Sequence, residues 1–253
     1  MTAITWNVNS LTVRLPDVLA LLDDARPDVL ALQETKIPDD RFPYEAFTER
    51  GWHAYACGQR TYNGVAVITK EPARVVHRGA PPGLDDDQAR LLVVEQQGMW
   101  WASVYAPNGQ APGTDKYAYK LRWFAAFADW MRQAFPPRAA LLGDFNVAPT
   151  DRDVHDPKRW EGKILCSPPE RDAFRRLCEA GELVDAVRAV EPEAPMFTWW
   201  DYRLRAFARG WGLRIDHVLV RGLEPVAAEV LVAYRTKERP SDHAPLKVVL
   251  KEA

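Results

Sequence analysis

An acidic residue and an amide follow one apolar stretch of this chain. In residues 141–149, LLGDFNVAP, two leucines precede Asp144 and Asn146, and Pro149 prevents the segment from continuing as a helix. Side chains two apart in a strand point the same way, so we expect Asp144 and Asn146 to converge on one small volume. A carboxylate and a carboxamide placed there suit a water nucleophile, a metal ion or a phosphoryl oxygen. The same residues could also form a turn that caps its own backbone.

Polar side chains at the ends of predicted strands recur along the chain. The other positions are Asn7, Glu34, Tyr105 with Asn108, Asp216, and Asp242 with His243. Loops at one end of a rigid scaffold are where binding and catalytic sites are commonly built. The set is rich in oxygen ligands, contains no Cys and has one His, which favours Mg²⁺ or Mn²⁺ over zinc.

Hydrophobic patterning predicts the elements that position these residues. The expected strands are 2–8, 29–33, 53–57, 64–69, 90–95, 99–105, 138–142, 213–220, 226–233 and 245–250, with 53–57 and 64–69 forming one hairpin and 90–95 and 99–105 another. The expected helices are 14–24, 115–135 and about 170–180, and residues 150–169 form a long loop. Strand pairs interleaved with helices predict two packed sheets flanked by helices, in a single α/β domain over residues 1–253.

Composition limits the class of protein without indicating a partner. The 253 residues are 47% apolar and 11% aromatic, as in a globular protein with a sizeable core. With 33 basic and 35 acidic residues the net charge is -2, so a nucleic-acid binder would have to concentrate positive charge locally. The three cysteines have no C-x-x-C spacing, and neither a signal peptide nor an apolar span is visible. We therefore expect a cytoplasmic protein with inert thiols and no membrane partner.

Seven segments, in chain order, carry a resemblance to a known family: WNVNS, LQETK, VYAPNG, GDFNVAP, TWWDYR, GLRIDHVL and SDHAP. With them the chain is similar to the exonuclease III family of apurinic/apyrimidinic (AP) endonucleases, within the DNase I-like endonuclease/exonuclease/phosphatase superfamily. The resemblance extends from about residue 4 to residue 250. It implies an α/β four-layer sandwich of two packed mixed β-sheets flanked by helices.

The resemblance implies which residues hold a metal ion and the substrate phosphate. Glu34 would be the principal ligand of a divalent cation, Mg²⁺ or alternatively Mn²⁺, with Asn7 and Asp242 assisting. Such a cation polarises a phosphodiester oxygen and neutralises charge on the leaving 3′-oxygen. Tyr105 and Asn108 would contact the scissile phosphate.

The resemblance also implies the catalytic groups. Asp144 would deprotonate the attacking water as a general base, and Asn146 would hold that water or a phosphate oxygen. His243, oriented by Asp216, would donate to the non-bridging oxygen and stabilise charge in the transition state. His217 is adjacent to Asp216, but neighbours on a strand face opposite ways, so we interpret it as structural.

An aromatic and basic stretch is the candidate surface for substrate recognition. Residues 197–215 combine bulky apolar side chains with four arginines: Arg203, Arg205, Arg209 and Arg214. This composition is typical of a surface that grips phosphates and stacks on nucleic acid, although part of it could be a core Trp cluster with solvated arginines. By resemblance, Trp199, Leu213 and Ile215 match positions that wall the pocket for a flipped-out abasic sugar.

The activity implied is that of exodeoxyribonuclease III and AP endonucleases. The enzyme would hydrolyse the phosphodiester 5′ to abasic sites in double-stranded DNA and remove nucleotides and blocked groups from 3′ ends, as a monomer. An alternative within the superfamily is a phosphatase or phosphodiesterase for inositol phosphates or lipids. Such an enzyme is expected to have a membrane-facing apolar loop or a cluster of lysines that binds several phosphates. A non-catalytic DNA-binding protein should have lost at least one of the catalytic residues, and all are present.

Overall fold

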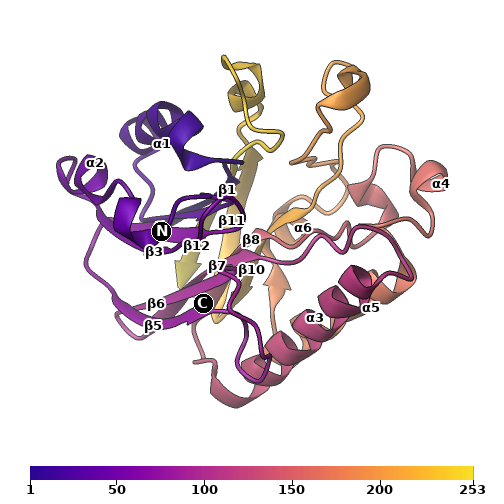
Figure 1. The fold of residues 1–253 in the computed structure, drawn as a ribbon, viewed down its shortest axis with the longest axis horizontal. Coiled ribbons are helices and arrows are strands. Elements are labelled where there is room, and N and C mark those ends of the chain that lie inside the picture. The colour runs from indigo at the N-terminus through magenta and orange to yellow at the C-terminus, as the bar shows by residue number, and fades with distance from the viewer. Residues whose placement is uncertain (253) are drawn as a thin grey trace.

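Two six-stranded β-sheets pack face to face at the centre of the molecule (Figure 1). The computed structural model describes residues 1–252. The first sheet, in the order β11-β12-β1-β2-β4-β3, contains β1 (Thr2–Asn7), β2 (Val29–Gln33), β3 (His53–Cys57), β4 (Val65–Thr69), β11 (Leu223–Val230) and β12 (Leu246–Glu252). The second, in the order β5-β6-β7-β8-β10-β9, contains β5 (Arg74–Gly79), β6 (Leu91–Gln96), β7 (Met99–Tyr105), β8 (Ala139–Asp144), β9 (Val184–Asp185) and β10 (Asp216–Arg221). Both sheets are mixed, because β1 runs parallel to β2 and β7 runs parallel to β8.

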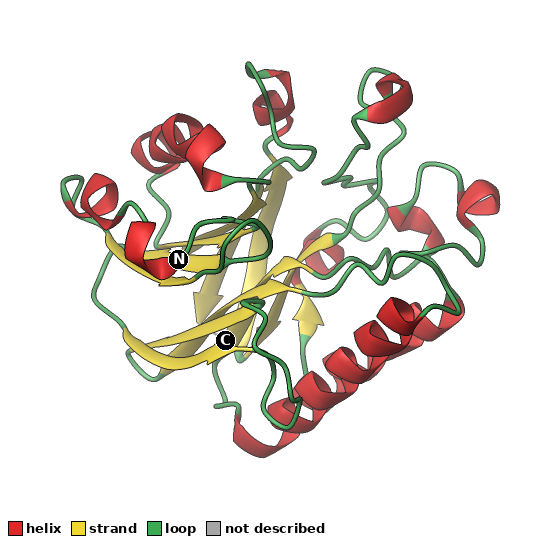
Figure 2. Ribbon diagram, viewed as in Figure 1, coloured by secondary structure: helices red, strands yellow, loops and turns green. Residues whose placement is uncertain are grey.

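Helices cover the outer faces of the two sheets (Figure 2). These are α1 (Leu11–Ala25), α2 (Tyr44–Thr48), α3 (Asp115–Ala134) and α5 (Pro168–Gly181), whereas α4 (Pro157–Trp160) lies in the loop after β8 and α6 (Ala186–Val190) packs against the core between the sheets. Buried residues of α1 pack on the outer face of the first sheet, and those of α3 and α5 pack on the second. The four-layer fold that the resemblance implied is therefore confirmed.

The central strands are apolar on both sides because both of their faces are covered. In β2, Val29 and Ala31 belong to the core between the sheets, whereas Leu30 and Leu32 belong to the core beneath α1. All four side chains are fully buried. The segment VLALQ is thus a continuous apolar run rather than an alternating one.

A polar network links the two sheets within the core. Thr5 Oγ1 donates to Gln33 Oε1 at 3.2 Å, and Gln33 Nε2 donates to Ser103 Oγ at 3.0 Å. Ser103, on β7 of the opposite sheet, donates in turn to the carbonyl of Leu32 at 2.9 Å. Because these groups are buried, sliding one sheet over the other would leave them without partners, at a cost of about 1–3 kcal/mol for each lost partner. The network therefore fixes the register of the sheets.

Strand direction brings the candidate residues to one edge of the sandwich. Parallel β1 and β2 end there at Asn7 and Gln33, and parallel β7 and β8 end there at Tyr105 and Asp144. Antiparallel β10 begins at the same edge, where its first residue, Asp216, pairs with Asp144. The strands alone therefore bring together residues that are far apart in the sequence, without any contribution from the loops.

Two expected strands differ from the structure by three residues at one or both ends. The strand predicted at 213–220 begins only at Asp216, because Leu213 instead forms isolated bridges with flanking loops. Asp216 is therefore the first residue of a strand, whereas the sequence pattern predicted it at the end of one. The strand predicted at 226–233 is β11, which starts and ends three residues earlier, since Val232 begins a 3₁₀ turn.

The two predicted hairpins are confirmed, because β3 pairs with β4 and β6 pairs with β7 in antiparallel register. The structure adds β5, β9, α2 and α6, and it places the short helix α4 within the loop expected at 150–169. In the described part of the chain, no helix has the length and apolar character needed to cross a membrane.

Candidate active site

Asp144 lies at the centre of a buried polar cluster. Its Oδ2 accepts a hydrogen bond of 2.9 Å from Asn7 Nδ2, and the same amide donates to Glu34 Oε1 at 2.9 Å. Asp144 ends a strand of the second sheet, whereas Asn7 and Glu34 end or follow strands of the first. Asn7 thus joins two carboxylates across the two sheets, while its own Oδ1 accepts from the backbone N–H of Asn9.

His243 lies between two carboxylates. Its Nδ1 is 2.8 Å from Asp216 Oδ2, and its Nε2 is 3.7 Å from Asp144 Oδ2. Burial alone would lower the pKa of His243, but the negative charges of Asp216 and Asp144 overcome this effect and raise the pKa to about 10. The imidazolium is therefore the stable form at neutral pH, and Asp216 fixes its orientation.

The pKa of Asp144 is also raised, which for a carboxyl group favours the uncharged form. Burial raises the pKa of Asp144 to about 7; the charge of Asp216 adds to the rise, and that of His243 opposes it. A carboxylate whose pKa lies near neutral pH can accept a proton from water and release it again. The pair of Asp144 and His243 therefore offers an acceptor and a charged donor a few ångströms apart.

The loop after β8 turns Asn146 toward Asn108. Asn146 has a φ of 52°, in the left-handed region, and its N–H donates to Asp144 Oδ1 at 2.9 Å. Its Oδ1 accepts from Asn108 Nδ2 at 3.1 Å, and its Nδ2 donates to the carbonyl of Ala106 at 3.0 Å. The expected alignment of Asp144 and Asn146 on one strand face is wrong, because β8 ends at Asp144 and the two residues meet through a turn.

Tyr105 ends β7 beside the carboxylates. Burial, followed by the charges of Glu34 and Asp144, raises the pKa of Tyr105 well above its usual value. The phenol is therefore protonated at neutral pH and acts as a hydrogen-bond donor. The Arg90 guanidinium lies 5.0 Å from the centroid of the Tyr105 ring and stabilises it by a cation–π contact.

Asp242 connects to Glu34 through two residues, Asn9 and Lys36. Its Oδ2 accepts from Trp199 Nε1 at 3.0 Å, and its Oδ1 accepts from Asn9 Nδ2 at 3.1 Å. Lys36 Nζ donates to Asn9 Oδ1 at 2.5 Å and pairs with Glu34 Oε2 at 2.9 Å. Asn9 and Lys36 each lie two residues beyond a predicted site residue.

The charges around Asp144 fit a divalent cation. The cluster contains four carboxylates and two cationic side chains: Glu34, Asp144, Asp216 and Asp242, with Lys36 and His243. Oδ1 of Asp216 is buried without a hydrogen-bond partner. Ligand atoms from Asp144, Asp216 and His243 lie within 4.8 Å of one another. Mg²⁺ and Mn²⁺ prefer sites with net negative charge and oxygen ligands.

A cavity of about 610 Å³ adjoins the cluster at Trp199. Its lining combines aromatic and basic side chains and includes His155, Arg159, Trp160, Lys163, Trp199, Arg203 and Trp211. Leu213 and Ile215 are not among the lining residues; they are buried beneath Trp199 and Trp160 in one apolar cluster. Of the three predicted pocket residues, Trp199 alone faces this cavity.

Arg214 does not belong to the basic surface expected of residues 197–215. Its side chain is fully buried: Nε donates to Asp153 Oδ1 at 2.7 Å, and Nη1 and Nη2 donate to Asp185 at 3.0 and 2.8 Å. The expectation that it grips phosphate is therefore wrong. The two aspartates hold the segment that leads into Asp216.

Replacing Asp153 with Asn should destabilise the fold by about 3–5 kcal/mol, because it leaves a buried guanidinium undercompensated. Urea unfolding would measure the loss. Asp172→Asn on the exposed face of α5 is the matched control and should leave the unfolding midpoint unchanged, since solvent screens its pairs with Arg175 and Arg176. A midpoint for Asp153→Asn equal to that of the control would contradict the assignment.

The expectation that His217 is structural agrees with its position. Burial lowers its pKa to about 4, so the ring is neutral, and Nε2 is 2.9 Å from the carbonyl of Val147. It packs between Phe145 and Phe174, away from the solvent.

Lys120 is a polar contact of the site that sequence analysis missed. Its Nζ donates to the carbonyl of Asn146 at 2.6 Å and to that of Asn108 at 3.1 Å, and it pairs with Glu170. The sequence signal is a charged residue within the apolar stripe of α3, three positions after the buried Tyr117. A charge at such a position needs buried partners.

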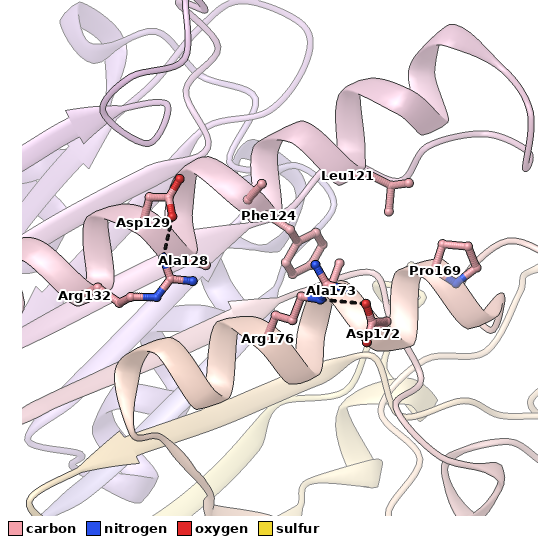
Figure 3. Close-up of a pocket in the computed structure, with 10 residues that line it drawn as sticks. Leu121, Phe124, Ala128, Asp129, Arg132, Pro169, Asp172, Ala173 and Arg176 are labelled. Carbon is pink, nitrogen blue, oxygen red and sulfur yellow. Dashed lines mark hydrogen bonds and ion pairs between the residues drawn. The ribbon is translucent and has the colours of Figure 1, made fainter.

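A second groove, of about 370 Å³, lies between α3 and α5 on the outside of the second sheet (Figure 3). Leu121, Phe124 and Ala173 form its floor, and Arg132 and Arg176 stand at its sides. None of its lining residues belongs to the cluster around Asp144.

Comparisons with known proteins agree with this geometry. Residues 4–243 match the Endonuclease/Exonuclease/phosphatase family. Exodeoxyribonuclease III of Haemophilus influenzae is 34% identical over 263 residues, which cover 97% of this chain and 98% of that protein. The 3′ phosphatase NExo from Neisseria, solved with a product DNA hairpin, is 44% identical, with a TM-score of 0.94 over 99% of both chains. An AP endonuclease from Archaeoglobus fulgidus is 31% identical, with a TM-score of 0.93 over 99% of both chains. The chain therefore belongs to the endonuclease/exonuclease/phosphatase family, and it is a metal-dependent nuclease of the exodeoxyribonuclease III type.

Proposed function

We propose that this protein is a Mg²⁺-dependent DNA repair nuclease that hydrolyses the phosphodiester 5′ to abasic sites and trims the 3′ ends of double-stranded DNA. One observation carries the proposal. A buried carboxylate, Asp144, lies 2.9 Å from the amide that holds Glu34 and 3.7 Å from an imidazolium, His243. A proton acceptor, a cation ligand and a charged donor thus meet at the point where a phosphodiester could be attacked by water.

Each side chain has one part in hydrolysis. Asp144 takes a proton from the attacking water, whose oxygen forms a new bond to phosphorus as the bond to the 3′-oxygen breaks. His243 donates from Nε2 to a non-bridging oxygen and stabilises the charge that develops there. Tyr105, as a protonated phenol, and Asn108 with Asn146 orient the phosphate. The 3′-oxygen leaves with the electron pair of the broken bond and takes a proton from solvent, and Asp144 later returns its proton to solvent, so that the products are a 3′-hydroxyl and a 5′-phosphate.

Glu34 is the proposed principal metal ligand, with Asn7 and Asp242 assisting. The chemistry supplied by a bound divalent cation is polarisation of a phosphodiester oxygen and neutralisation of the leaving 3′-oxygen. The surplus of four carboxylates over two cationic side chains around Asp144 supports a cation in this cluster. Mg²⁺ is our proposal for the metal, because all of the acidic ligands offer oxygen.

The basic and aromatic cavity beside Trp199 supports a DNA substrate. Arg159 and Arg209 lie 5.1 and 4.5 Å from the Trp211 ring centroid, so positive charge gathers there although the protein as a whole is slightly acidic. This local charge can bind the DNA backbone. An abasic nucleotide costs little to extrude because it has no base to unstack. We propose that the protein acts as a monomer and, given its three unpaired cysteines, in the cytoplasm.

A second candidate function is processing of 3′ ends with little abasic-site incision. Trp160 and Trp199 meet edge to face, with ring centroids 6.5 Å apart, above the buried Leu213 and Ile215. Leu213 and Ile215, which the resemblance placed in the pocket wall, are thus covered by the two indoles. The Neisseria relative is named a 3′ phosphatase, whereas the Archaeoglobus relative is named an AP endonuclease.

A gel assay distinguishes these functions. A duplex with one abasic-site analogue and an intact duplex would be incubated with the protein in Mg²⁺ and in EDTA. A metal-dependent nick immediately 5′ to the lesion supports the proposed function, and loss of nucleotides from 3′ ends alone supports the second candidate. If neither duplex is cut but inositol phosphates lose phosphate, both proposals fail.

Trp199→Ala should slow abasic-site incision by about 10-fold or more, because a recognition pocket loses one wall. Removal of a 3′-terminal nucleotide should change less, which steady-state rates on the two substrates would measure. Trp199→Phe is the control, since it keeps the ring but loses the hydrogen bond to Asp242. Equal losses on both substrates would assign Trp199 to the core instead of the pocket.

A further inference from the structure

Lys120 on α3 contacts two loops that carry substrate-binding amides. Its side chain is fully buried, and its ammonium group donates to the carbonyl of Asn146 at 2.6 Å and to that of Asn108 at 3.1 Å. The third contact is an ion pair with Glu170, which is also fully buried, at the start of α5. Since an ammonium has three donors, every one of them is used.

The two loops depend on this contact for their shape. Asn146 holds a left-handed φ of 52°, a conformation that asparagine adopts more readily than other non-glycine residues, and its carbonyl in this conformation accepts from Lys120. The loop after β7 lies on the stem of Lys120, because a Cβ added to Gly109 would be 3.0 Å from Lys120 Cδ. A single side chain thus fixes the backbone of both loops from beneath.

Stability alone does not account for such a buried pair. Replacing a buried ion pair by apolar or neutral groups of similar size is often neutral for folding, because the charges no longer have to lose their hydration. Glu170 has other contacts that keep it in place, since its carboxylate accepts from the backbone N–H groups of Leu165 and Ser167. The hydrogen bonds to the two loop carbonyls, in contrast, are made by Lys120 alone.

We propose that Lys120 is a positioning residue for phosphodiester cleavage: it holds Asn108 and Asn146 at the separation that allows both amides to orient the scissile phosphate. The inference rests on the proposed nuclease activity. Asn108 Nδ2 and Asn146 Oδ1 are 3.1 Å apart in this arrangement. Without the ammonium, the carbonyls of both residues would lose their buried donor and the loops would turn to find another.

The test compares two variants that change the charge pair in different ways. Lys120→Met combined with Glu170→Gln removes both charges and both carbonyl contacts while keeping the volume. We expect kcat to fall by about 10²-fold, as for a misplacement of about 1 Å, with KM for an abasic duplex nearly unchanged. Glu170→Gln alone leaves the lysine and its carbonyl contacts, so kcat should stay within about threefold of the parent although the unfolding midpoint falls.

A double-mutant cycle with Asn146→Ala separates positioning from a general structural role. If Lys120 acts through Asn146, the paired substitution should cost far less in the Asn146→Ala background than in the parent. Full additivity would overturn the inference, as would parental kcat in the Lys120→Met/Glu170→Gln protein or a kcat for Glu170→Gln that falls with its stability. Failure of the parent protein to cut DNA would instead overturn the proposed function.

Discussion

Asp144→Asn should lower the rate of phosphodiester cleavage by about 10²- to 10⁴-fold while DNA affinity changes little. Asparagine retains the oxygen that accepts from the N–H of Asn146, but it cannot take a proton from water. The variant therefore removes the proposed base and almost no contact area. Single-turnover rates, together with fluorescence anisotropy of a labelled abasic duplex, would measure the two quantities separately.

Asp129→Asn is the matched control for this substitution. Asp129 lies on the exposed side of α3 and pairs only with Arg132, so its loss should leave rate and binding at parental values. If Asp144→Asn weakens DNA binding by the same factor as it slows cleavage, Asp144 contributes to binding and another group is the base.

Glu34→Gln should raise the Mg²⁺ concentration for half-maximal activity by at least about 10- to 100-fold. The substitution removes a negative charge from the proposed principal ligand and leaves Lys36 without its carboxylate partner. Direct titration of Mn²⁺ by electron paramagnetic resonance gives a readout that does not depend on turnover. The affinity measured in this way should fall by a similar factor.

Glu229→Gln provides the comparison on an exposed strand, β11, where Glu229 pairs with Lys247. Its metal titration should coincide with that of the parent protein. A Glu34→Gln protein with unchanged Mg²⁺ and Mn²⁺ titrations would remove Glu34 from the ligand set and leave the Asp144, Asp216 and His243 side of the cluster as the metal site.

The strands that carry the site were predictable because their patterns are local. β2 and β8 are short apolar runs that end in polar residues, and the polar residues lie where the runs suggest. The edge strand β5 escaped prediction because its side chains alternate between exposed and half-buried without a clear apolar face. Covered strands leave a stronger sequence signal than edge strands do.

Contacts between distant segments were not predictable from pattern. Nothing in the sequence around Arg214 distinguishes a buried arginine from a surface one, because its aspartate partners are 61 and 29 residues away. The contact of Lys120 with Asn146 likewise joins residues that are distant in the sequence. The shape of the GDFN turn also depends on the end of β8, which periodicity places only to within a few residues.

The strand order of the first sheet determines how late in synthesis the active site can be completed. β12 lies between β11 and β1, although it is the last described strand to be synthesised, and His243 comes just before it. A growing chain that has not yet reached residue 243 therefore holds Glu34 and Asp144 but lacks both the imidazole and the strand that joins β11 to β1. Such a chain should be catalytically silent, although it already contains the proposed base and the proposed principal metal ligand.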